Sequence, residues 1–250
     1  MWLAKIKAAT NHFVATLLII GFAACLVFYI WYPGFYSHVM PGLQLFIIMA
    51  CVDLVLGPCM SLVIFNSNKS RKELFRDYSL IVFIQLIALG YGIFSVSQVR
   101  PVYVALNTDS LQVVSASEIQ SAHMGVSGEF SHLPWSGPKL VCFRAPANEA
   151  ETKEALEMAS NGIAQYAVPK YFKACDKNQL VSAAKSITEI KKIARESKDN
   201  EMLNTLEKIN DIDQRYVWMP MRSRFSESIV FINITTEKPE YILDKNKKLH

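Results

Sequence analysis

The sequence has few charged residues and few cysteines for its length. Of its 250 residues, 51% are hydrophobic and only 19% are charged, whereas soluble globular proteins carry about 25% charged residues. An ordinary cytosolic enzyme is therefore disfavoured. Five cysteines are too few for a secreted scaffold built on disulfides. Disordered low-complexity chains are also excluded, because a chain this apolar can bury enough surface to fold.

The chain also lacks the motifs of common catalytic and cofactor sites. It contains no Gly-x-Ser-x-Gly nucleophile elbow, no phosphate-binding glycine loop, no dinucleotide fingerprint and no Cys-x-x-Cys pair. No histidine has a histidine or cysteine partner at metal-ligand spacing; the five are His12, His38, His123, His132 and His250. The sequence therefore predicts a protein that is not an enzyme, with no catalytic residue, no cofactor and no bound metal.

Three long hydrophobic runs occupy the first hundred residues. Asp53 is the only charged residue in these runs, which span 13–31, 43–65 and 79–97. About 20 apolar residues in a helix cross a hydrocarbon core roughly 30 Å thick, and in lipid the backbone must satisfy its own hydrogen bonds. We therefore predict a three-helix transmembrane domain over residues 1–99 and a second domain over residues 100–250.

Basic residues set the predicted orientation of these helices. Lys5 and Lys7 precede the first run and four Lys or Arg residues lie within 66–78, whereas the segment 32–42 has none. Because positively charged segments stay in the cytoplasm, the N-terminus and the 66–78 loop are expected there. Three crossings then place residues 100–250 on the far side of the membrane, which is the periplasm if the source is a Gram-negative bacterium.

Other interpretations of the first run fit less well. A cleaved signal peptide has a shorter apolar stretch and a small-x-small site after it, and neither is found here. The sequence Phe22-Ala23-Ala24-Cys25 faintly resembles a lipoprotein cleavage box, but six more apolar residues follow it. A membrane-spanning helix is therefore the favoured interpretation.

The second run carries unusual chemistry. Asp53 lies near its middle, where a carboxylate is costly unless it is paired, hydrated or protonated. Pro58 cannot donate a helical hydrogen bond and is expected to kink or loosen the helix, and Gly57 beside it permits a close helix neighbour. The third run returns in the opposite direction. Counting residues by depth places Gln85 about level with Gly57, and Asp53 about level with the residues from Ala88 to Tyr91.

Asp53 has both a structural and a functional explanation. As a structural residue it would be protonated or hydrogen-bonded and would join the second and third helices, which the small residues Ala88 and Gly92 allow to touch. As a functional residue it would respond to protons or pair with a polar group in the membrane segment of a partner. No arginine or lysine lies inside any run, so no internal ion pair is available. A transport path is disfavoured, because three helices with one acid form a poor conduit.

Residues 100–250 combine strand and helix patterns. Helical spacing predicts a helix between Asn148 and Asn161 and two more over 179–196 and 199–211. Strands are predicted at 102–106, 111–114, 139–144, 215–221, 228–234 and 240–243. We therefore expect an α+β domain with mainly antiparallel strands, and a frayed end over 244–250.

The cysteines divide between the two predicted domains. Cys142 and Cys175 are the only two beyond the third run, on the side where disulfides persist. We predict a disulfide between them that closes a loop of about 34 residues and stabilises the fold by roughly 3–4 kcal/mol in the chain-entropy model. The alternative is two unpaired thiols. Cys25, Cys51 and Cys59 are expected to be core residues of the membrane helices.

Six segments follow one another in a recognisable order. They are Trp31-Tyr32-Pro33, Asp53–Pro58, Lys69–Asp77, Gln85–Gly92, Arg100-Pro101-Val102 and Tyr216–Met221. The last contains Trp218 and Pro220 in a Tyr-x-Trp-Leu-Pro-Leu pattern with methionine at both leucine positions. This order resembles the TfpX/TfpZ (FimB-like) family of type IV pilin accessory proteins. The resemblance covers the whole chain and is most specific over 31–102; no motif of the family matches within 144–175.

The resemblance implies a non-enzymatic inner-membrane protein that is paired with a cognate type IV major pilin and assists pilin assembly or pilus dynamics. The lipid bilayer and other inner-membrane components of pilus assembly are further expected partners. No nucleic-acid partner is expected, because Lys191, Lys192 and Arg195 form only a short basic face on a balanced helix. Two alternative functions stay open: a membrane-bound periplasmic sensor or regulator, and a membrane-embedded pilin-modifying factor.

The same segments supply the candidate partner-binding or structural residues. They are Asp53, Gly57, Pro58, Gln85, Tyr91, Gly92, Arg100, Pro101, Trp218 and Pro220. We hypothesise that Gly57, Pro58 and Gln85 help to form a groove for the apolar helix of a pilin. The C-terminal domain would contact the variable pilin head.

Overall fold

The chain forms two compact units. The computed structural model describes residues 2–66, 69–120, 124–125, 128–244 and 248–250. Unit 1 comprises Met1–Trp31 and Pro41–Val99, and unit 2 comprises Tyr32–Met40 and Arg100–His250. The segment Tyr32–Met40 connects two apolar helices in the sequence, yet it packs with the C-terminal part of the chain.

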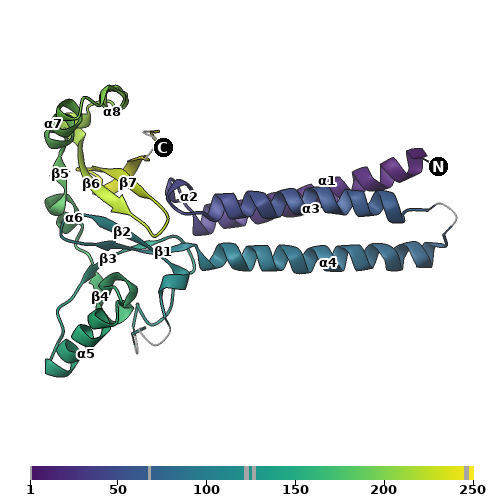
Figure 1. Cartoon of the computed structure of the whole chain (residues 1–250), viewed down its shortest axis with the longest axis horizontal. Coiled ribbons are helices and arrows are strands. Elements are labelled where there is room, and N and C mark those ends of the chain that lie inside the picture. The colour runs from purple at the N-terminus through teal and green to yellow at the C-terminus, as the bar shows by residue number, and fades with distance from the viewer. Residues whose placement is uncertain (1, 67–68, 121–123, 126–127, 245–247) are drawn as a thin grey trace. The chain divides into compact units, whose positions relative to one another are not determined.

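Unit 1 consists of three long helices (Figure 1). α1 (Trp2–Leu26) continues into a π-helical turn, η1 (Val27–Trp31), and is followed by α3 (Gly42–Ile64) and α4 (Arg71–Gln98). Each is long and apolar enough to cross a membrane. The predicted three apolar helices are therefore confirmed.

Two of these helices extend beyond their apolar runs. α1 already begins at Trp2, and α4 begins at Arg71 rather than near residue 79. α4 starts early because Ser70 and Glu73 form a capping box. The N–H of Glu73 donates to the Ser70 hydroxyl (3.3 Å), and the N–H of Ser70 donates to the Glu73 carboxylate (2.8 Å).

α3 is the central helix of unit 1. It packs along both α1 and α4, which contact each other much less. Its buried face carries Phe46, Asp53, Gly57 and Ser61. Three of these are four residues apart, so polar and small groups form one stripe along the helix. The expectation that the cysteines of unit 1 are core residues is wrong, because they lie on other faces and are exposed: Cys25, Cys51 and Cys59.

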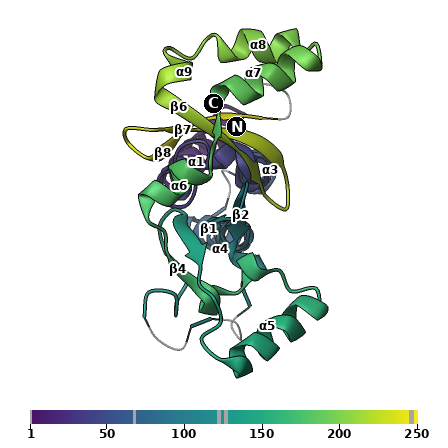
Figure 2. The same ribbon diagram turned by 90° about the vertical axis from the view of Figure 1, so that its left-hand side faces the viewer.

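Unit 2 is built on a mixed β-sheet (Figures 1 and 2). In the described part of the chain the sheet has eight strands in the order β4-β3-β1-β2-β6-β7-β8, with β5 paired to β6. The strands are β1 (Pro101–Leu106), β2 (Leu111–Ser115), β3 (Lys139–Phe143), β4 (Phe172–Ala174), β5 (Lys185–Ser186), β6 (Tyr216–Arg222), β7 (Glu227–Asn233) and β8 (Lys238–Leu243). The pairs β1–β3 and β2–β6 are parallel and the others are antiparallel. The predicted α+β class with mainly antiparallel strands is confirmed.

Helices lie at both ends of this sheet (Figure 2). The group near β6–β8 comprises α7 (Ile187–Glu196), α8 (Asn200–Leu206) and α9 (Ile212–Arg215), and α5 (Glu149–Ser160) lies near β4. The shorter elements are α2 (Tyr36–Val39), α6 (Lys177–Ala183) and the 3₁₀ turns η2 (Ala116–Glu118), η4 (Gln165–Ala167) and η5 (Pro169–Tyr171). The predicted single helix over 179–196 is wrong. Lys185 and Ser186 pair with β6 instead and separate α6 from α7.

Two hydrophobic clusters and a disulfide hold unit 2 together. One cluster joins α7 and its neighbours to β6 and β7 and includes Trp218 and Phe231. The other lies on β1–β4 and includes Phe172. Cys142 and Cys175 form a disulfide with their Cα atoms 5.0 Å apart. The bond ties β3 to the residue that follows β4.

The C-terminal residues add to this sheet. The N–H of His250 donates to the carbonyl of Ile242 (2.9 Å), and the N–H of Ile242 donates back to the carbonyl of His250 (3.1 Å). The expected fraying over 244–250 is therefore wrong for the described residues 248–250, because strand-like hydrogen bonds fix them.

The segment Tyr32–Met40 is anchored at two points in unit 2. The ring of His38 stacks on that of His250 with 3.8 Å between their centroids. The hydroxyl of Ser226, in the turn between β6 and β7, donates to the carbonyl of Val39 (2.8 Å). These contacts explain why a connection between two apolar helices belongs to the C-terminal unit.

Candidate functional site

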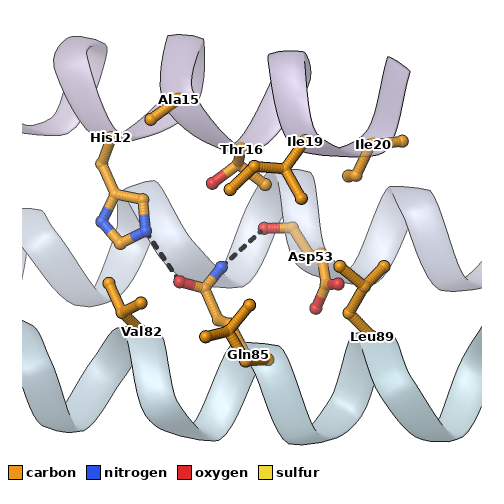
Figure 3. Close-up of a pocket in the computed structure, with 10 residues that line it drawn as sticks. His12, Ala15, Thr16, Ile19, Ile20, Asp53, Val82, Gln85 and Leu89 are labelled. Carbon is orange, nitrogen blue, oxygen red and sulfur yellow. Dashed lines mark hydrogen bonds between the residues drawn. The ribbon is translucent and has the colours of Figure 1, made fainter. Parts of the chain in front are cut away.

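The candidate site lies inside unit 1, where side chains from α1, α3 and α4 converge (Figure 3). Asp53 on α3 is only 5% exposed, and Gln85 on α4 reaches across to its backbone. His12 and Thr16, one turn apart on α1, face the same space. Four polar side chains therefore meet within an otherwise apolar bundle.

A chain of hydrogen bonds connects the three helices. Nδ1 of His12 lies 2.5 Å from the hydroxyl of Ser61, and its Nε2 lies 2.7 Å from Oε1 of Gln85. Nε2 of Gln85 donates to the backbone carbonyl of Asp53 (3.3 Å). Because the amide oxygen can only accept, Nε2 of His12 is the donor in its bond to Gln85. The chain runs from α3 to α1, on to α4 and back to α3.

Two glycines provide the space for this arrangement. A Cβ atom at Gly57 would overlap Nε2 of Gln85 and would lie 3.0 Å from Nε2 of His12. A Cβ atom at Gly92 on α4 would overlap the side chain of Met49 on α3. The two glycines therefore permit the close approach of α3 and α4.

A cavity of about 80 Å³ adjoins this network. Its lining is mostly apolar, and its members are His12, Ala15, Thr16, Ile19, Ile20, Asp53, Val82, Gln85, Leu86 and Leu89. In the part of the chain that the structure describes, no hydrogen bond or ion pair engages the carboxylate of Asp53. Such a group can hold a proton or accept a donor that enters the cavity. The described residues contain no group of three His, Cys, Asp or Glu side chains that could hold a metal ion.

The structure brings some of the predicted residues together and separates another. Gln85 lies beside Gly57 and reaches Asp53. Tyr91, expected level with Asp53, is 72% exposed and lies on another face of α4. α3 continues through Pro58 to Ile64. The space beside Gly57, where a groove for a partner helix is hypothesised, is filled by the protein's own side chains.

Sequence reasoning missed His12 and Ser61. His12 directly precedes the first apolar run, and Ser61 lies near the end of the second. A signal for both is present in the spacing, because His12 and Thr16 are four residues apart, as are Gly57 and Ser61. Small or polar residues at four-residue intervals form one stripe on an apolar helix.

The four remaining predicted residues lie in unit 2: Arg100, Pro101, Trp218 and Pro220. Pro101 opens β1, and burial lowers the pKa of Arg100 beside it. Trp218 is buried in β6, and its Nε1 donates to the carbonyl of Ser186 (3.0 Å). Pro220 follows in the same strand. Trp218 therefore joins β5 to β6 and has a structural role in this sheet.

The chain is similar to known fimbrial assembly proteins. Residues 1–40 match the family model described as Fimbrial assembly protein FimB. The fimbrial assembly proteins of serogroups E1 and I from Dichelobacter nodosus are 33% and 34% identical to it over 158 residues, 63% of this chain and 62% of each relative. The chain thus spans less than two thirds of these two relatives. The protein of serogroups C1 and C2 is 35% identical over 113 residues, 45% of this chain and 86% of the relative. No solved structure matches. The chain belongs to the FimB family of fimbrial assembly proteins.

Proposed function

We propose that this protein is a non-enzymatic accessory protein of the bacterial inner membrane. It binds a cognate type IV major pilin and assists or modulates pilin assembly and pilus dynamics. The observation that carries the proposal is membership of the FimB family, whose relatives from Dichelobacter nodosus are named fimbrial assembly proteins.

The architecture of each unit supports this role. Unit 1 has three helices suited to a membrane, and their outer faces expose large apolar side chains. Unit 2 is a folded domain with its own hydrophobic clusters. Before assembly, a pilin lies in the membrane as one apolar helix with a folded head outside it. These two parts correspond to the two units of this protein. Unit 1 would contact the helix, and unit 2 would contact the head.

Charge and disulfide chemistry support the proposed topology. The Lys and Arg residues around unit 1 cluster at its N-terminus and between α3 and α4, which favours a cytoplasmic location for both segments. Unit 2 carries the Cys142–Cys175 disulfide, and such bonds persist in the periplasm but are rare in the cytosol. We therefore place unit 2 in the periplasm.

A clean deletion in the native bacterium tests the role in assembly. Sheared surface pili and total cellular pilin are quantified side by side in the deletion strain, the parent and a complemented strain. We expect fewer pili with normal cellular pilin. Repeating the deletion in a retraction-deficient background separates assembly from retraction. Unchanged pili would contradict the proposal for that pilin and would favour a sensor or regulator.

Co-purification tests the binding of pilin directly. The full chain is captured from solubilised inner membranes, and bound major pilin is quantified against total pilin. We expect stoichiometric capture of the cognate pilin and much weaker capture of a pilin from another strain with a different head. Equal capture of both would argue against recognition of the head by unit 2.

A further inference from the structure

Among the described residues, the buried carboxylate of Asp53 has no hydrogen-bond or ion-pair partner. Asp53 lies eleven residues from each end of α3, or about 16 Å at 1.5 Å per residue. It is 5% exposed, and no described residue forms a hydrogen bond or an ion pair with its carboxylate. Because an acid at this depth is costly without a partner, the side chain marks a binding site whose second component is not part of this network.

In the described part of the chain, no lysine or arginine pairs with this carboxylate. Residues 8–68 and 77–99 contain no lysine or arginine. His12 is the nearest basic group on α1, but both of its ring nitrogens are engaged, one by Ser61 and the other by Gln85. An ionised Asp53 would therefore need a cation from outside the chain.

The cavity beside Asp53 can admit one long side chain. Its volume is about 80 Å³, and a single water needs roughly 10–15 Å³ by the same measure. Its lining comes from α1, α3 and α4 (Figure 3). Because α1 and α4 contact each other little, a side chain from a neighbouring helix would enter between these two. Ile19, Ile20 and Leu89 in its wall suit a methylene stem.

We propose that Asp53 and this cavity bind one lysine-type ammonium group carried by the membrane helix of a partner protein. Charge complementarity selects the occupant, because a buried ammonium on the partner is as costly alone as the carboxylate. A straight stem with one compact charge also suits a single carboxylate, whereas a guanidinium presents five donors in a planar fork. The inference rests on the proposed function only in that a partner presents its membrane helix to unit 1.

Synthetic membrane helices test this inference without any pilin. The full-length protein is labelled and reconstituted in phosphatidylglycerol–phosphatidylethanolamine nanodiscs with labelled 23-residue Leu/Ala helices. The helices differ only at the central residue, which is Lys, Leu or Asp, and energy transfer reports association. We expect the Lys helix to bind at least tenfold more tightly than the Leu helix. Asp53→Asn should reduce this ratio to about one.

Two further variants separate recognition from folding. Leu89→Phe keeps the carboxylate but fills the cavity, so it should also remove the preference for the Lys helix. Val52→Ala changes an exposed side chain of α3 next to Asp53 without adding a polar group, and it should leave the preference unchanged. Helix content and protease resistance of unit 2 are measured for every variant. Loss of the preference in Leu89→Phe supports the site even where Asp53→Asn folds poorly.

The outcomes distinguish this inference from the proposed function. Equal binding of the Lys and Leu helices by the wild-type protein would overturn the inference, as would tighter binding of the Asp helix, which would identify Asp53 as a protonated donor. Pilin co-purification is measured on the same preparations. Captured pilin without a Lys preference would leave the proposed function standing alone, and a Lys preference without captured pilin would leave only the inference.

Discussion

The two units of this protein keep their elements together by opposite means. Unit 2 encloses apolar side chains such as Phe231, whereas unit 1 turns its apolar side chains outwards and joins its helices through His12, Gln85 and the space at Gly57. Lipid is as apolar as leucine, so burial of apolar surface contributes little to helix association in a membrane, and close packing and hydrogen bonds decide it. The same kind of substitution should therefore have different effects in the two units.

The largest effect is expected where an apolar side chain is removed from unit 2. Phe231 is fully buried, and Phe231→Ala should lower the free energy of unfolding by about 3–5 kcal/mol, because the transfer and cavity terms add. Thermal unfolding of the full chain in detergent, followed by the protease resistance of unit 2, measures this loss. Phe225→Ala in the exposed β6–β7 turn and Phe22→Ala on the outer face of α1 are controls. Equal losses in all three variants would refute the contrast.

Removing the disulfide of unit 2 should cause the next largest loss of stability. Cys142 and Cys175 are 33 residues apart, and opening that loop should destabilise unit 2 by roughly 3–4 kcal/mol in the chain-entropy model. We expect the double serine variant to unfold unit 2 at lower temperature while unit 1 keeps its helix content. Replacing the free cysteines of unit 1 is the control: Cys25, Cys51 and Cys59. If the double serine variant kept its protease resistance while the control variant lost it, the disulfide would be dispensable.

A smaller effect is expected when the polar network of unit 1 is broken. Gly57→Ala would displace the amide of Gln85 and should cost about 1–3 kcal/mol, the usual range for a buried polar group left unsatisfied. Gly90→Ala is the matched control, because nothing lies within 4 Å of a Cβ atom there. Denaturant-induced separation of α3 and α4, followed by energy transfer between labels on the two helices, measures the loss.

A double-mutant cycle sharpens this prediction. In a Gln85→Ala background the overlap with Gly57→Ala disappears, so the two losses should combine to less than their sum, with a coupling of about 0.5–3 kcal/mol. Additive losses would mean that Gly57 acts through backbone flexibility alone.

The fold follows from the sequence more directly than the site does. Long unbroken apolar runs predict helices, because only helices satisfy the backbone of such segments in lipid. Short apolar runs such as 216–221 and 228–233 predict strands, and these two strands pair. The disulfide can be predicted from the sequence because only two cysteines lie beyond the third apolar run. The two-residue strand Lys185–Ser186 cannot be predicted from its own residues, because it forms only by pairing with β6, which is distant in the sequence.

Predicting the site requires information that the residue pattern of a single helix does not contain. The relative depth of Gln85 and Gly57 can be counted along two antiparallel helices. The rotation of each helix about its axis cannot be counted, so the depth count does not show that Tyr91 is exposed on another face of α4. His12 was missed because it lies just before an apolar run, although the structure places it at the centre of the network. Spacing on one helix indicates a stripe, but only the packed bundle shows what that stripe contacts.

The smallest effect is expected at the surface of unit 2, where Glu151 anchors the start of α5. Its carboxylate accepts two hydrogen bonds from Arg144 (2.8 and 3.1 Å) and one from the N–H of Ala147 (2.7 Å). These bonds lower the pKa of Glu151 from its usual 4.5 to about 2, with the arginine contributing most. Because the pKa is depressed in the folded state, the stabilisation is complete above pH 4.5 and is lost as the pH falls towards 2.

Hydrogen exchange of α5 between pH 5 and pH 3 measures this loss. We expect exchange, corrected for its intrinsic pH dependence, to increase in the wild type as Glu151 takes up a proton. Glu151→Gln should exchange faster at pH 5 and change little on acidification, since its side chain cannot titrate. Glu157→Gln, on the same helix but outside this cluster, should behave like the wild type. An acid-induced increase that persists in Glu151→Gln would show that another group controls α5. The Arg144–Glu151 pair would then add nothing measurable to what the apolar clusters and the disulfide of unit 2 supply.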